Sequence, residues 1–137
     1  MKYLAILREN DLPTISRVGG ASTTQVVTPK CGAKSFLNGF TELPPKASIP
    51  LHYHNCEESV LIVRGDATVE VDGEQFVAKV GDVTWLPEKV PHRFINSSKT
   101  EILRIFWTYA CPSPTRTLVC SGETSSILSE QISMPDV

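Results

Sequence analysis

The stretch LHYHNCEESVLIVRG, Leu51–Gly65, contains two of the chain's three histidines, separated by a single tyrosine, ahead of a run of apolar residues. In a β-strand successive side chains point to opposite faces. His52 and His54 would therefore share one face, with Tyr53 on the other. Since two imidazoles on one face can bind the same cation, the stretch predicts a strand that carries part of a metal site.

Two further residues could complete such a site. Glu58 follows His54 by four positions, with a turn expected between them, and the third histidine, His92, lies downstream in LPEKVPHRFIN. Three neutral imidazoles and one carboxylate suit one divalent transition metal per chain (Fe, Mn, Zn, Ni or Cu) and match Ca or Mg poorly. Glu57 is a competing carboxylate, but its position breaks the strand alternation, which favours a solvated role or a contact with a ligand residue.

The residues around this stretch, from about 25 to 119, read as strands and turns. Asp72-Gly73 between two β-rich runs is the signature of a type I′ hairpin turn, and Gly81-Asp82 marks a second turn. No segment in this part shows a sustained helical period, and short strands separated by Gly and Pro predict an all-β sandwich or barrel. Two apolar runs have strand length, ESVLIVRG and EILRIFWTYA.

Composition limits the classes of partner. At 137 residues, with 41% hydrophobic and 20% charged residues, the chain is expected to form one globular domain. A net charge of -2 without a run of Lys or Arg argues against a nucleic acid or a membrane surface as partner. No apolar run approaches the roughly 20 residues that span a bilayer. MKYLAILREN is a poor signal peptide, so a soluble, cytoplasmic protein is expected.

The cysteines show neither a CxxC pair nor a metal-ligand spacing among themselves. In a reducing compartment they are expected to be thiols. Cys56 alone lies inside the histidine stretch, where it is either functional or a small filler beside a polar site. The four positions are Cys31, Cys56, Cys111 and Cys120.

Both histidine-bearing segments resemble sequence motifs of the cupin family. The first motif is matched by His52, His54, Glu58 and Gly65, and the second by Gly81, Pro87, His92 and Asn96. The resemblance covers about residues 43–109. It implies a double-stranded β-helix, a small jelly-roll-type barrel, with His52, His54, Glu58 and His92 facing its interior as metal ligands.

Two lysines depart from the motifs. Lys46 and Lys89 stand where the family usually has glycines that serve backbone turns. A lysine held there with positive φ would cost on the order of 1 kcal/mol. The expected ligand positions are unaffected.

The expected organisation has three parts. Residues 1–24 form an N-terminal arm, with a possible strand at a dimer contact, residues 25–119 form the barrel, and residues 120–137 form a tail with a possible short helix in SSILSEQI. The resemblance also implies a homodimer, for which KYLAIL and RIFWTY are the candidate contacts because exposed strand edges need cover.

Several functions are compatible with this site. Four protein ligands around an ion that prefers six positions leave two open, where a dicarbonyl, enol or hydroxy acid could chelate. We expect a metal-dependent enzyme acting on such a small molecule by dioxygenase or by isomerase or lyase chemistry. The alternatives are a non-catalytic binding or sensing module and a metal-free structural protein. The candidate catalytic residues are Arg64, which could point inward, Arg104, which needs an acidic or anionic partner, Glu57 and Tyr109.

Overall fold

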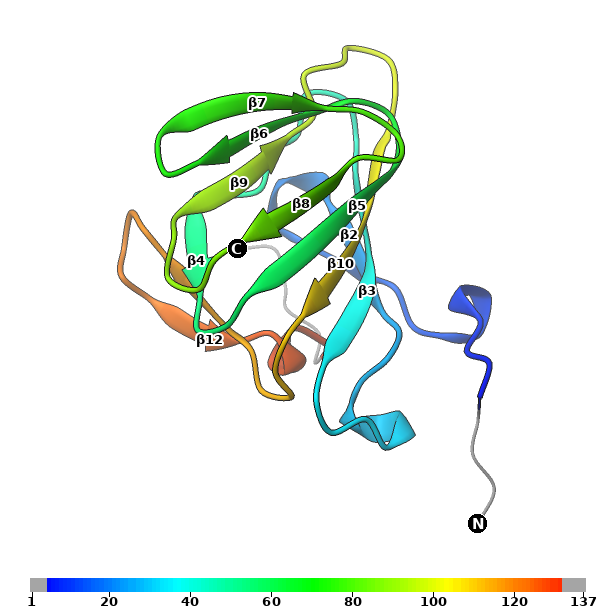
Figure 1. The fold of residues 1–137 in the computed structure, drawn as a ribbon. Helices are drawn as coiled ribbons and strands as arrows, with labels where there is room; N and C mark the ends of the chain where they lie inside the picture. The colour runs from blue at the N-terminus through cyan, green and yellow to red at the C-terminus, as the bar shows by residue number, and fades with distance from the viewer. Residues whose placement is uncertain (1–4, 132–137) are drawn as a thin grey trace.

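The computed structural model describes residues 5–131, which form two six-stranded antiparallel sheets (Figure 1). The first sheet has the order β1 (Ile15–Ser16), β2 (Ser22–Gln25), β3 (Leu37–Leu43), β10 (Leu103–Tyr109), β5 (Glu58–Arg64) and β8 (Val83–Leu86). The second has the order β12 (Thr124–Ser126), β11 (Thr115–Leu118), β4 (His52–His54), β9 (His92–Ile95), β6 (Ala67–Val71) and β7 (Glu74–Ala78). The described residues also form four short 3₁₀ helices, η1 (Glu9–Asp11), η2 (Val18–Gly20), η3 (Pro29–Cys31) and η4 (Leu128–Gln131).

From β3 to β11 the chain crosses repeatedly from one sheet to the other, with β6 and β7 as the one hairpin that stays within a sheet. This winding is the double-stranded β-helix that was expected, and the all-β prediction is confirmed. Among the described residues, no helix combines the length and the apolar character needed to cross a membrane.

Alternating burial along the central strands builds the core. In β3 and β10 every second side chain is buried, as the period of two for a strand requires. The indole of Trp107 points inward and donates a hydrogen bond to Thr41 Oγ1 at 2.8 Å. Its ring needs Gly39 opposite, because a Cβ there would lie 2.6 Å from the ring and 2.5 Å from the Thr24 carbonyl oxygen.

The turns have the geometry that their residues predict. Asp72 and Gly73 both have positive φ, 49° and 84°, as a type I′ hairpin turn requires. Lys46 and Lys89, at the usual glycine positions, also have positive φ, 67° and 61°. The turn geometry is therefore kept without the glycines. The Lys89 N–H donates to the His54 carbonyl oxygen at 2.8 Å, which ties this turn to the strand of the two histidines.

Strands extend beyond both ends of the expected barrel range. β1 and β2 join the first sheet within residues 15–25, and β12 pairs with β11 after residue 119. The helix expected in SSILSEQI is the short η4, preceded by β12. RIFWTY is part of β10, whose two edges are already paired with β3 and β5, so only its outer face is available to a second copy. Part of KYLAIL, residues 2–4, lies outside the described residues, so its dimer contact stays a prediction.

Candidate metal centre

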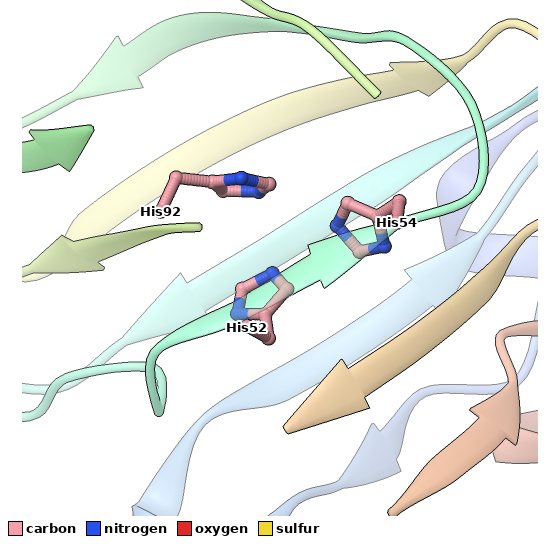
Figure 2. A group of neighbouring side chains, drawn as sticks. All are labelled: His52, His54 and His92. Carbon is pink, nitrogen blue, oxygen red and sulfur yellow. The ribbon is translucent and has the colours of Figure 1, made fainter. Parts of the chain in front are cut away.

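The three histidines meet between the two sheets because of strand alternation and register. β4 has the burial pattern buried, half-buried, buried, so His52 and His54 point inward and Tyr53 outward, as expected. His92 is the residue of β9 that pairs directly with His52. The ring centroids lie 4.5–5.0 Å apart, and Figure 2 shows the three rings converging. At most 4% of each histidine is exposed.

Each imidazole is oriented by a backbone carbonyl at its Nδ1 atom. His52 Nδ1 lies 2.6 Å from the Pro50 oxygen, and His92 Nδ1 lies 2.9 Å from the Val90 oxygen. His54 Nδ1 lies 2.9 Å from the oxygen of Thr115, which is distant in sequence. A carbonyl can only accept, so each Nδ1 carries the proton. In the neutral rings the Nε2 lone pairs are therefore available, the arrangement typical of histidines that bind metals.

Glu58 comes to this site from the other sheet. The chain turns over residues 55–57 between β4 and β5, so the carboxylate faces the histidines. Its Oε1 atom lies 3.2 Å from His92 Nε2 and 3.4 Å from His54 Nε2. A carboxylate oxygen facing a lone-pair nitrogen requires a cation between them, either a proton or a metal ion. Two ligands about 2.1 Å from one ion lie roughly 3.0–3.4 Å apart, so the observed spacing suits a metal.

An unsatisfied buried atom also supports this interpretation. His54 Nε2 is buried and has no hydrogen-bond partner, whereas buried polar atoms are almost always paired. The Nε2 atoms of the three histidines are thus the atoms expected to bind a metal. The three residues form a cluster with ligand atoms within 4.8 Å of one another. Glu58 is the fourth candidate, adjacent to two members of the cluster.

Burial and charge set the protonation of the site. Burial lowers the pKa of His52 well below its ordinary value, and the positive charge of Arg116 lowers it further. Burial alone would raise the pKa of Glu58, but the imidazoles of His54 and His92 beside it outweigh burial and lower this pKa. A neutral imidazole and an ionised carboxylate are the forms that bind metals.

A small cavity adjoins these ligands. His52, Glu58 and His92 line one part of it, and its volume is about 30 Å³. This is space for an ion together with a water-sized ligand, so a larger molecule can enter only if lining side chains move. The remaining wall is largely apolar, with Ile49, Phe94, Ile105, Trp107, Tyr109 and Ile127.

Residues 39–109, more than half of the chain, match the family model described as a cupin domain. The chain is a cupin. Its histidine cluster occupies the motif positions on which the resemblance rested, and those positions fall within the matched residues.

Relatives of this cupin include two proteins of Streptomyces. It is 33% identical over 89 residues to "Polyketide synthase CurC" of Streptomyces cyaneus. The aligned residues cover 64% of this chain and 58% of that protein. It is 29% identical over 102 residues to "Protein SchB" of Streptomyces halstedii, which covers 74% of both. Among solved structures, the polyketide cyclase RemF of Streptomyces resistomycificus superposes with a TM-score of 0.69 at 19% identity, over 93% of this chain and 85% of that chain. This last likeness is one of fold.

Arg64 does not lie in the cavity of this cupin, contrary to the expectation that it could point inward. Ile62 is buried and Arg64 is exposed, although they are two positions apart. The reason is an irregularity in the pairing of β5 with β10, where Ile62 and Arg64 oppose the adjacent residues Ile105 and Arg104. The extra residue between them is a β-bulge, which reverses the alternation.

Arg104 and Glu57 also lie away from the cavity. Arg104 is on the outer face of β10, where it forms salt bridges with Glu9 and, at 2.6 Å, with Glu42. Its guanidinium lies over the ring of Phe40, 4.1 Å from the centroid. The acidic partner it was expected to need is therefore this pair of carboxylates. Glu57 is exposed and accepts a hydrogen bond of 2.6 Å from the indole of Trp85.

Tyr109 is the candidate that does lie beside the histidines. It is buried, its ring centroid is 4.7 Å from that of His54, and it lines the cavity. Arg116, which sequence reasoning had not singled out, lines the same cavity from β11. The sequence pattern around Arg116 does not indicate a place in the cavity, because only the pairing of β11 with β4 brings Thr115–Leu118 to the histidines.

The thiol of Cys56 is partly shielded from solvent. It is half-buried against the core and lies in hydrogen-bond contact with Cys111. Burial, and then the hydrogen bond with Cys111, raise the pKa of Cys56 to about 12. All four cysteines are free.

Proposed function

We propose that this cupin is a metal-dependent enzyme that acts on a small, oxygenated, metal-chelating metabolite of the dicarbonyl, enol or hydroxy acid type. The proposed ligands of one mononuclear metal are His52, His54, His92 and Glu58. The observation that carries the proposal is the set of three buried imidazoles, each with Nδ1 held by a carbonyl and with ligand atoms within 4.8 Å of one another.

A divalent metal bound there would act as a Lewis acid on chelated oxygens and increase the acidity of a C–H bond between two carbonyl groups. The protein's part is positioning and exclusion of water. The carbonyl contacts keep the imidazoles in one orientation, and Glu58 contributes a negative charge. The apolar wall with Phe94, Ile105 and Trp107 lowers the local dielectric and strengthens these electrostatic interactions.

Two branches of chemistry are open to such a site, and the relatives favour one. CurC is described as a polyketide synthase and RemF as a polyketide cyclase. Polyketide chains carry carbonyl groups in 1,3-relationship, which is the chelating pattern proposed here. We therefore favour non-redox chemistry through an enolate, of the isomerase, lyase or cyclase kind, over an O₂-dependent cleavage.

The test is proton exchange on a simple 1,3-diketone. Metal-loaded protein is incubated with acetylacetone in D₂O, and exchange at the central carbon is followed by NMR without O₂. Enzyme of the proposed kind accelerates exchange, and the His92→Ala variant does not, whereas Tyr53→Phe, an outward-facing control, behaves as wild type.

The same incubation in air separates the alternatives. Stoichiometric O₂ consumption with cleavage of the diketone would support the dioxygenase branch instead. Saturable binding of the diketone with neither exchange nor O₂ uptake would support a non-catalytic binding module and contradict the enzyme.

A further inference from the structure

Two of the four cysteines face each other where the pairing of β5 with β10 ends. The antiparallel pairing continues one step past both strands, where the Ala110 N–H donates to the Glu57 carbonyl oxygen at 3.0 Å. In the same register the next pair of residues is Cys111 and Cys56. Their side chains are in hydrogen-bond contact, so the two thiols point toward each other.

This arrangement has the spacing that a disulfide requires. Directly opposed residues of an antiparallel pair have Cα atoms about 4.5–5.5 Å apart. A disulfide joins cysteines whose Cα atoms lie about 4.4–6.8 Å apart, so an S–S bond between Cys56 and Cys111 needs no large movement of the backbone. Both cysteines are free and half-buried, which leaves a small reagent access to the pair.

The two loops that carry these cysteines also hold a proposed metal ligand in place. Asn55 Oδ1 accepts a hydrogen bond from the Thr115 N–H at 2.8 Å, and Asn55 Nδ2 donates to the Ser113 carbonyl oxygen at 3.3 Å. The Thr115 carbonyl oxygen in turn lies 2.9 Å from His54 Nδ1. The two hydrogen bonds of Asn55 are exposed to solvent, and a disulfide would join the same two loops covalently.

We propose that Cys56 and Cys111 are a redox-active pair, which a low-molecular-weight disulfide converts to a reversible disulfide that joins residues 55–57 to residues 110–114. The Cys111 sulfur first attacks the reagent, which releases one reduced thiol and leaves a mixed disulfide on Cys111. The Cys56 sulfur then displaces the second reduced thiol. One S–S bond of the reagent is broken and one forms in the protein, while two electrons and two protons pass from the cysteines to the released thiols.

The order of these steps follows from how the two thiols are placed. Cys56 packs against the hydrophobic core, so Cys111 is the thiol that meets a reagent from solution. The second step takes place within one molecule, between groups already in contact, and such reactions proceed at very high effective concentrations. A Cys56 thiol that reacts slowly with reagents from solution therefore still closes the bond. Neither step involves the metal or the substrate of the proposed reaction.

The test is oxidation of the purified protein with oxidised glutathione, followed by trypsin digestion without reducing agent and by peptide mass spectrometry. The expected product links residues 47–64 to residues 105–116, the tryptic peptides that contain Cys56 and Cys111. Dithiothreitol should release the two peptides. Cys111→Ser should lose the linked product. The double variant Cys31→Ser/Cys120→Ser, which removes the two exposed thiols, should retain it and is the matched control.

Thermal unfolding of the same samples tests whether the bond joins the loops without distortion. A disulfide that closes a loop of about 55 residues should raise the melting temperature by at least about 5 °C, and dithiothreitol should reverse the rise. A linked product that leaves the melting temperature unchanged overturns the proposal. So does its absence while Cys31 and Cys120 carry glutathione. If Cys111→Ser does not fold, Cys56→Ser serves in the same comparison.

Discussion

The orientation of the His54 side chain depends both on its own strand and on a segment distant in sequence. The HYH alternation predicts that it shares a face with His52, and the burial pattern of β4 shows that this face points inward. Its tautomer depends on the carbonyl of Thr115, in a segment that only the fold brings close. The buried Nε2 atom, with no hydrogen-bond partner, is the feature that a bound metal would satisfy. Glu58 adds the carboxylate, from a different sheet.

Removal of one imidazole is expected to abolish stable metal binding. His52→Ala or His92→Ala should reduce the metal content of the purified protein at least tenfold, because each imidazole supplies one of the four proposed bonds to the ion. Elemental mass spectrometry of tag-free protein measures this. Tyr53→Phe, between the two histidines but facing outward, should retain the wild-type content. Unchanged metal in both alanine variants would contradict the proposed site.

Cys56 is expected to be unreactive despite its place between two proposed ligands. Its raised pKa, about 12, leaves almost no thiolate at neutral pH, and the thiolate is the reactive form. Alkylation by iodoacetamide at pH 8, followed by peptide mass spectrometry, should be at least tenfold slower at Cys56 than at the exposed Cys31 and Cys120. The difference should disappear in guanidinium chloride. Rapid alkylation of Cys56 in the folded protein would argue for a functional thiol.

The proposed ligands lie on strands, and the sequence predicted the direction of strand side chains correctly where the alternation is regular. The two-residue period placed His52 and His54 on one face and the Asp72-Gly73 turn in a type I′ hairpin. The same rule failed for Arg64, because the bulge opposite Arg104 and Ile105 inserts one residue into β5. A bulge depends on how two strands fit together, so the pattern of one strand does not reveal it.

Glycine at either lysine turn is expected to stabilise the protein. Lys46 and Lys89 are exposed and have positive φ, so their side chains contribute little packing while the backbone is strained. Lys46→Gly and Lys89→Gly should each increase the free energy of unfolding by about 1 kcal/mol. Urea denaturation at constant metal concentration measures the change. Lys89→Ala retains a Cβ and should show no such gain, and two destabilised glycine variants would contradict the argument.

The whole barrel buries its ionisable site between two sheets, and this makes stability depend on pH. His52 has a pKa lowered from its ordinary value of 6.5, mainly by burial. Below about pH 6.5 the unfolded chain therefore binds a proton that the folded chain does not bind. Glu58, with its lowered pKa, acts in the same direction below its ordinary value of 4.5. The first loss of stability on acidification is thus assigned to His52.

Metal-free protein is accordingly expected to lose stability as the pH falls from about 6.5, by at most about 1.4 kcal/mol per pH unit for one proton. Thermal melts in the presence of a chelator at pH 7.5, 6.5 and 5.5 measure this. The His52→Gln variant should show a shallower dependence in the same window. A melting temperature that stays constant from pH 7.5 to 5.5 would show that burial of His52 is not linked to folding.

The all-β fold and the shared face of His52 and His54 could be inferred from the sequence pattern, because strand alternation and turn residues are local properties. The inward direction of these residues and the inclusion of Glu58 and His92 came from the resemblance to the cupin motifs. The roles of the arginines could not be inferred. Arg104 lies against Glu9 and Glu42, and Arg116 reaches the histidines, through pairings between strands far apart in the sequence. An arginine in an apolar strand requires a partner wherever it lies, and which partner it meets depends on sheet register. That register exists only once the two sheets have assembled.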